Sequence, residues 1–144
     1  MAVEKGQVIL VSSVFCDLQI QSNAGLHSII NVHSGITLGS TLSPAELSLQ
    51  KIRSGSNLLI MLQSEKERNA AIRVVGKGPS GARVFDASHS GKLAGDWNLT
   101  TIPIPVIMEI GEEGLYWFEI LLTGTVIGKV PLTVKFDRLP RQQS

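Results

Sequence analysis

A stretch near the end of the chain, Gly111 to Phe136, constrains the fold more than any other. It holds two runs in which apolar residues alternate with others, Leu115–Leu122 and Val126–Phe136, on either side of Thr123-Gly124-Thr125. A period of two is the signature of a β-strand, and a short loop containing glycine closes a hairpin. The sequence therefore predicts a β-hairpin here.

The two faces of this hairpin differ in character. The first strand has one fully apolar set, which predicts a core face: Tyr116, Phe118, Ile120 and Leu122. Its other set is mixed: Leu115, Trp117, Glu119 and Leu121. In the second strand the predicted core set is Val126, Val130, Leu132, Val134 and Phe136. One buried and one partly wet face is typical of a layer in an antiparallel sandwich.

Further strands are predicted from short apolar runs between turn formers. They cover residues 7–20, 29–36, 57–63, 70–75, 82–87 and 99–110. The first is apolar on both faces, which favours a strand that is covered on both sides, with a strand at a subunit contact as the alternative. Pro103 and Pro105 favour a sheet edge for 99–110, or a stretch that leaves the sheet, because proline cannot donate to a ladder. Residues 89–98 are predicted to be a loop or an irregular edge.

These elements predict an all-β fold, an antiparallel β-sandwich of the Ig-like or jelly-roll kind with about eight strands. Ser43-Pro44-Ala45-Glu46 fits a helix start, so at most one short helix is expected, near residues 44–52, with a strand as the alternative. Residues 1–137 are expected to form one domain, and residues 138–144 a flexible C-terminal tail.

The chain from Leu99 onward resembles a family of small, uncharacterised bacterial β-sandwich proteins. The resemblance lies in a Gly-x-Tyr-x-Phe-x-Ile strand, a glycine turn and a Pro-Leu-x-Val strand. Here these are Gly114–Ile120, Thr123-Gly124 and Pro131–Val134. The resemblance implies a sandwich fold. It carries no activity and no catalytic residues, since that family has none assigned.

The composition indicates which kinds of binding partner and which cellular compartment to expect. The formal net charge of +1 gives no overall attraction to nucleic acid or to an anionic membrane, and the basic residues are scattered along the sequence. No signal peptide or membrane span is visible, and the one cysteine, Cys16, cannot form an internal disulfide. We therefore expect a cytoplasmic protein that binds neither nucleic acid nor membrane.

Residue patterns for catalysis are weak. The candidate metal ligands include His27, His33 and His89, but no close-spaced pair of ligands occurs, so no metal site and no cofactor are predicted. No Gly-x-Ser-x-Gly motif is present, and Cys16 lies in an apolar run, where a thiol is usually an inert packing residue. The sequence therefore leans away from an enzyme.

The mixed face of the hairpin suggests a binding surface instead. Leu115, Trp117 and Leu121 are predicted to point outward, beside Ile107, and exposed apolar patches usually mark contacts. We expect a non-enzymatic interaction or assembly module that binds a protein partner or itself. The alternative is a small-ligand or carbohydrate-binding module that uses Trp97, Trp117 and the loop ends, and a metal-assisted enzyme ranks third.

Overall fold

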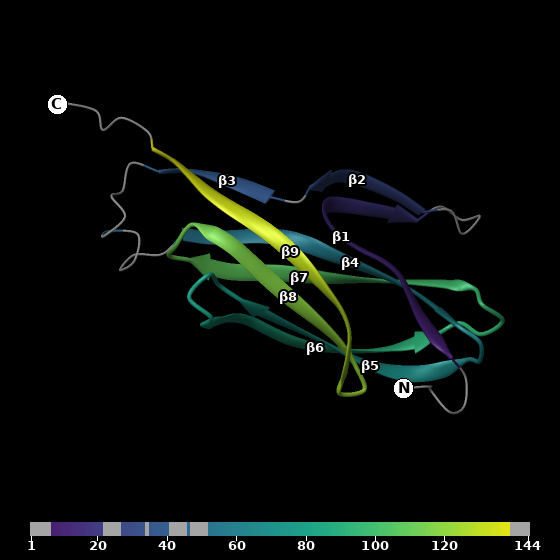
Figure 1. Ribbon diagram of the computed structural model, residues 1–144. Coiled ribbons are helices and arrows are strands. Elements are labelled where there is room, and N and C mark those ends of the chain that lie inside the picture. Colours follow the sequence, from purple (N-terminus) through teal and green to yellow (C-terminus); the bar gives the residue numbers. More distant parts are fainter. Residues whose placement is uncertain (1–6, 22–26, 34, 41–45, 47–51, 139–144) are drawn as a thin grey trace.

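The computed structural model of the chain describes residues 7–21, 27–33, 35–40, 46 and 52–138. The described residues form nine strands, arranged in the two layers that Figure 1 shows. Their bounds are β1 (Val8–Gln21), β2 (His27–His33), β3 (Gly35–Ser40), β4 (Ile52–Ser64), β5 (Arg68–Lys77), β6 (Arg83–Leu93), β7 (Leu99–Ile110), β8 (Gly114–Leu122) and β9 (Thr125–Arg138).

The strands divide into a four-stranded sheet, β2-β1-β4-β7, and a five-stranded sheet, β3-β9-β8-β5-β6. Side chains from the two inner faces form one core between the sheets. The predicted all-β sandwich is confirmed. The pairing is antiparallel as expected, except that β3 runs parallel to β9, from Gly35 opposite Thr133 to Ser40 opposite Arg138.

Strand order favours the Ig-like form of the sandwich over the jelly roll. β9-β8-β5-β6 follows the order G-F-C-C′ of an Ig variable-type sheet, and β4-β7 follows B-E. The Tyr116 hydroxyl near the start of β8 donates to the Glu112 carbonyl, 2.7 Å away. A tyrosine at this corner that bonds back to upstream backbone is the tyrosine corner of Ig-like domains. Burial raises the pKa of the Tyr116 phenol, with a further rise from the nearby charge of Glu112.

Phe118, two residues after Tyr116, joins the two sheets. Its ring lies edge-on to that of Phe15 on β1, with the ring centroids 5.0 Å apart. Phe85 on β6 lies 6.3 Å from it, centroid to centroid. Gly76 on β5 makes room, because a Cβ there would lie 2.5 Å from the Phe118 ring. The core therefore depends on one large side chain that fits against a position without a side chain.

β1 is central, between β2 and β4, as its two apolar faces predicted. Phe15 and its neighbour Cys16 point to opposite sides of the strand and are both fully buried. The coverage does not extend along the whole strand, because Ile9 and Val11 are exposed. The Cys16 side chain is thus enclosed, as its apolar run suggested.

β7 is an edge strand of its sheet, as its prolines predicted. Pro103 and Pro105 lie opposite Leu59 and Asn57 of β4. The two prolines are two residues apart, so their backbone nitrogens point to the same side of the strand. That side faces away from β4, so no hydrogen bond to β4 is lost.

Three sequence predictions differ from the structure. The single strand predicted at 29–36 is wrong, because β2 ends at His33 and β3 begins at Gly35 in the other sheet. Of the two alternatives predicted for 89–98, a loop is wrong for residues 89–93, because they belong to β6, an edge strand of its sheet. Val126 is exposed, because a bulge between Ile120 and Leu121 reverses the side on which it lies.

The predicted helix near 44–52 falls on residues outside the described part, except for Glu46 and Ile52, and stays a prediction. Arg138 still belongs to β9, and residues 139–144 of the predicted tail lie outside the described residues.

Among the described helical residues there is no segment long and apolar enough to cross a membrane.

Gly76→Ala should destabilise the protein by about 1–3 kcal/mol, because the added methyl group overpacks against the Phe118 ring. Urea unfolding followed by circular dichroism measures this. Gly91→Ala on the paired strand β6 is the matched control, since its nearest atom, Ile102 Cδ1, is 3.8 Å from the new Cβ. Equal effects of the two substitutions would contradict the packing argument.

Tyr116→Phe should lower the free energy of unfolding by about 0.5–1.5 kcal/mol, because it removes only the hydrogen bond to the Glu112 carbonyl and keeps the buried ring. The same urea experiment measures the change. An unaltered unfolding midpoint would show that the corner hydrogen bond adds nothing to stability.

Candidate functional site

The outward side of the five-stranded sheet carries the site residues predicted on β8. We call this surface the Trp117 face: it comprises Leu115, Trp117, Glu119 and Leu121 with their outward neighbours on β9, β5 and β6. Leu115 is 42% exposed and Trp117 is 44% exposed, while Leu121 is half-buried. The strand alternates strictly up to Leu122, so these side chains point away from the core that Tyr116 and Phe118 enter.

Trp117 lies in the interior of the sheet, between two strands. Its cross-strand neighbours are Pro131 on β9 and Lys77 on β5, and Lys77 lies opposite Arg83 on β6. All four residues are exposed. Cross-strand neighbours stand about 5 Å apart, so an apolar pair, Pro131 and Trp117, adjoins a basic pair on this row.

The next row along the strands contains Val75, an apolar residue on the outer side of β5. Its neighbours are Glu119 on β8 and Asp86 on β6. Val75 is only 6% exposed although it faces away from the core. The Lys77 ammonium lies 3.6 Å from Glu119, so long charged side chains lie around Val75, and their alkyl stems can cover it.

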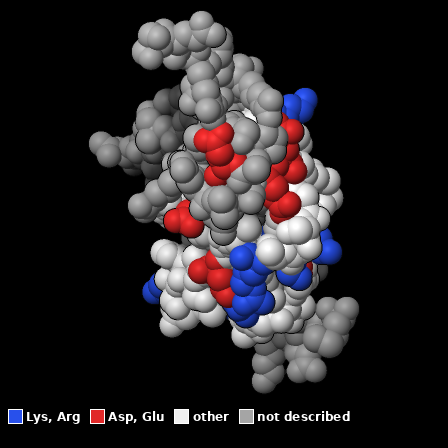
Figure 2. Space-filling view, turned by 90° about the vertical axis from the view of Figure 1, so that its left-hand side faces the viewer, with Lys and Arg blue, Asp and Glu red and all other residues white. Residues whose placement is uncertain are grey.

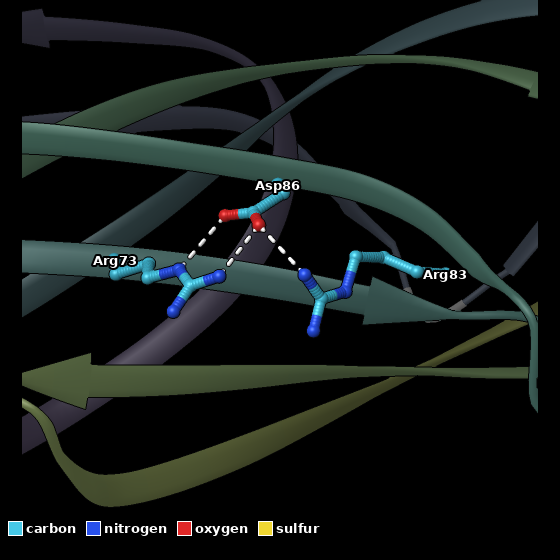
Figure 3. A network of polar contacts seen from close by, with 3 residues as sticks. All are labelled: Arg73, Arg83 and Asp86. Atoms are coloured by element: carbon cyan, nitrogen blue, oxygen red, sulfur yellow. Dashed lines mark hydrogen bonds and ion pairs between the residues drawn. The ribbon is translucent and has the colours of Figure 1, made fainter.

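Asp86 binds two arginines, as Figure 3 shows. Arg73 donates its Nε and Nη2 to the two carboxylate oxygens at 2.9 and 2.6 Å, and Arg83 donates its Nη1 at 3.1 Å. The hydrogen bond from Arg73 holds the pKa of the Asp86 carboxyl below its ordinary value, with help from the charges of both arginines against a smaller opposing effect of desolvation. The same hydrogen bond raises the pKa of Arg73. One carboxylate therefore positions two guanidinium groups.

The Trp117 face is basic as a whole. Among the strand side chains of this face that the structure describes, two are acidic, Asp86 and Glu119. Six basic side chains point to the same side from β5, β6 and β9: Arg73, Lys77, Arg83, Lys92, Lys129 and Lys135. Lys92 is paired with Glu67 in the preceding turn, at 2.9 Å. The whole chain has a net charge of only +1, so the fold collects positive charge on this face.

Acidic and basic side chains lie next to each other on the end of the sandwich that Figure 2 faces. The turn between β7 and β8 holds Glu112 and Glu113. Glu112 Oε1 accepts hydrogen bonds from the N–H and hydroxyl of Ser80 at 3.1 and 2.8 Å. Glu113 Oε1 accepts one from the Phe136 N–H at 2.6 Å. Both carboxylates therefore tie turns and strands together.

Trp97 lies away from the Trp117 face. The central residues of its turn, Asp96 and Trp97, have φ angles of 58° and 59°, and the Gly95 carbonyl accepts a hydrogen bond from the Asn98 N–H at 3.1 Å. These are features of a type I′ turn. Trp97 is 40% exposed, at the end of the sandwich where β7 begins, whereas Trp117 follows the turn at which β7 ends. The structure thus does not bring the two tryptophans onto one surface.

Ile107, which the sequence placed beside Trp117, belongs to the outer face of the other sheet. It is 51% exposed and lies opposite Gly55 of β4. It lines a shallow hollow of about 270 Å³ together with Gly55, Ser56, Asn57 and Pro105. The prediction was wrong because residues 107 and 117 are on consecutive strands that belong to different sheets.

The candidate metal ligands whose side chains the structure describes do not converge. Within the described ranges no group of three or more His, Cys, Asp or Glu side chains lies close enough together to hold a metal ion. His89 is an exposed residue of β6. His27 and His33 begin and end β2, and their side chains lie outside the described part.

Comparisons with known proteins bear on the fold. No family model and no curated protein matches the chain. Among solved structures, a β-glucosidase from Listeria innocua has a TM-score of 0.52 at 9% identity over 94% of this chain. The match covers 16% of the glucosidase chain. At such identity the likeness shows a shared β-sandwich fold and nothing of activity.

Two further structures have lower TM-scores. An alkylpurine DNA glycosylase from Pseudomonas fluorescens, bound to DNA containing an abasic site analogue, has a TM-score of 0.49 at 12% identity, and the match covers 71% of this chain and 27% of the glycosylase. An immunoglobulin-like protein from Pseudomonas aeruginosa has a TM-score of 0.42 at 11% identity, over 90% of this chain and 97% of that one.

Sequence reasoning missed the gathering of basic side chains. Within single strands the sequence does indicate which basic residues share a side. Arg73 and Lys77 on β5 are an even number of residues apart and so point to the same side, as do Lys129 and Lys135 on β9. Which strands lie side by side is the information that groups them, and spacing along the chain does not give it.

Asp86→Asn should destabilise the protein most at neutral pH, and the difference from the wild type should shrink as the pH falls below about 4. A carboxyl whose pKa is lowered by folding adds stability above its unfolded pKa, and loses it as the pH falls through the folded one. Urea unfolding of both proteins between pH 2 and 7 checks this. A difference that is constant over that range would contradict it, and 0.5 M NaCl should reduce the difference at pH 7 because the groups are exposed.

Proposed function

We propose that the chain is a non-enzymatic interaction module that binds another protein through the Trp117 face. The observation that carries the proposal is the exposure of Trp117 and Leu115 side by side on one face of a central strand. Tryptophan is enriched among the residues that dominate binding energy at interfaces, and charged or polar surroundings suit the rim of such a contact.

The cost of exposing these side chains supports the proposal. Apolar area removed from water is worth about 25 cal/mol per Å², so a partner that covers an exposed indole gains free energy. Isolated exposed apolar residues are ordinary, but here Leu115, Trp117 and Pro131 adjoin one another across two strands. Trp117 and Pro131 thus form a small apolar patch that an apolar side chain of a partner can contact.

A saccharide-binding module is the other function considered for these tryptophans. Sugar platforms on β-sandwiches combine aromatic rings, and Trp97 and Trp117 lie in separate regions of the surface. We therefore favour protein binding. We also keep the cytoplasm as its place, since the one cysteine is enclosed within the fold and needs no oxidising compartment.

The experiment compares the wild type with the double variant Leu115→Ala/Trp117→Ala. Proteins retained from a lysate of the native host are quantified by mass spectrometry, and binding to one purified partner is then measured directly. The variant should bind that partner at least about tenfold more weakly, since anchor residues at interfaces are worth 2 kcal/mol or more.

The matched control is Ile107→Ala, which truncates an equally exposed apolar residue on the opposite outer face. It should leave the affinity for the partner unchanged. Unfolding midpoints of all three proteins confirm that the variants fold. Equal binding by the wild type and the double variant would refute the proposal.

A further inference from the structure

We infer that the occupant of the Trp117 face is an acidic protein segment with an apolar anchor, and not a second copy of this chain. The inference rests on the proposed function and specifies its partner. It follows from the arrangement of charge around the exposed apolar residues.

The apolar residues form a strip along β8. Leu115 and Trp117 adjoin on its outer side, Glu119 separates them from Leu121, and Pro131 widens the strip on the β9 side. Residues two apart on a strand are separated by about 6.6 Å, so the three span about 20 Å. That length matches an extended segment of about six residues, or four turns of a helix laid along the strip.

Basic side chains flank this strip on both sides. Lys129 and Lys135 lie on β9, while Lys77 and Arg73 lie on β5, opposite Trp117 and Leu121. A segment that lies along β8 with its apolar side down would therefore pass between two positive rows. Carboxylates on both of its edges would be complementary to them.

The guanidinium groups are held in position before any partner binds. Arg83 donates one N–H group to Asp86, and a guanidinium carries five. Arg73 is gripped at both Nε and Nη2, so its direction is fixed. Preorganised donors lose less conformational entropy when they bind an incoming carboxylate.

A second copy fits this face poorly. In a two-fold dimer the same patch meets itself, so six basic side chains would face six others, with three acids from each copy, Glu67, Asp86 and Glu119, to offset them. All three acids are already paired within the chain, to Lys92, Arg73 and Lys77 among others. Like charges brought together across an interface cost free energy.

Single-stranded nucleic acid is the other anionic occupant to weigh. Proteins that bind it stack successive bases on several aromatic side chains. In the described part of the five-stranded sheet the outward side presents one aromatic residue, Trp117, with aliphatic neighbours along β8. The mixture of one indole with leucine and proline suits an apolar protein side chain better.

The test uses defined probes and the fluorescence of Trp117. The chain has two tryptophans, so Trp97→Phe leaves Trp117 as the single reporter. The main probe is a twelve-residue peptide with Asp and Glu on either side of a central Leu-Phe pair. The comparison probes are the same peptide with Asn and Gln in place of the acids, and a twelve-nucleotide oligo(dT).

The acidic peptide should change Trp117 fluorescence, and its affinity should fall at least tenfold between 0.05 and 0.5 M NaCl. The neutral peptide should bind at least tenfold more weakly. Lys129→Glu should weaken the acidic peptide at least fivefold, while Lys66→Glu, the same change of charge in an exposed turn off the face, should have no effect. Unfolding midpoints verify that both variants fold.

Three results would overturn the inference: equal binding of the acidic and neutral peptides, tighter binding of oligo(dT) than of the acidic peptide, or a wild-type dimer in sedimentation equilibrium that Trp117→Ala dissociates. The partner used to test the proposed function separates the two claims. If Leu115→Ala/Trp117→Ala abolishes binding of that partner and Lys129→Glu does not weaken it, the proposed interaction module is supported and the inference of an acidic partner is refuted. If neither variant affects binding, both the proposed function and the inference are refuted.

Discussion

The packing of Phe118 against Phe15 and over Gly76 is the interaction on which the rest of the structure depends. It joins β8 of one sheet to β1 of the other at the centre of the core. Because side chains alternate along a strand, fixing Phe118 and Tyr116 inward also fixes Leu115 and Trp117 outward. The exposed anchor is therefore a consequence of the core, and its orientation cannot change without a change in the register of β8.

Period and turn chemistry were enough to predict the hairpin, its core set on β8 and the exposure of Trp117. They failed at Val126, because the bulge at Ile120 and Leu121 adds one residue to β9 and reverses the parity beyond it. Gly128, next to the bulge, leaves no room for a side chain, because a Cβ on it would lie 2.5 Å from Leu10 Cδ2 of the other sheet. A constraint between residues so distant in sequence leaves no local pattern.

The basic character of the Trp117 face has the same origin. Arg73 and Lys129 are far apart in the chain, and only the order β9-β8-β5-β6 places them on either side of one strip. The sequence indicates which residues of one strand point to the same side. It does not indicate the order of the strands, which depends on the crossovers between the two sheets. Net charge near neutrality concealed the asymmetry, since the acids that balance these residues include turn residues such as Glu112 and Glu113, which accept hydrogen bonds there.

The sheet edges bear on how such a module can associate. β7 is an edge, and an incoming strand would need N–H groups along it. Pro103 and Pro105 remove two of them at positions that point away from β4, so a continuous ladder cannot form on that side. Backbone pairing at this edge is thus blocked, and a contact there would have to use side chains. The outward side of β8 differs from an edge, because the backbone of β8 is paired on both sides. It presents the Trp117 indole between basic side chains of β9 and β5. A partner of the proposed kind would have to match both the apolar strip and the charges beside it, which would make its recognition selective.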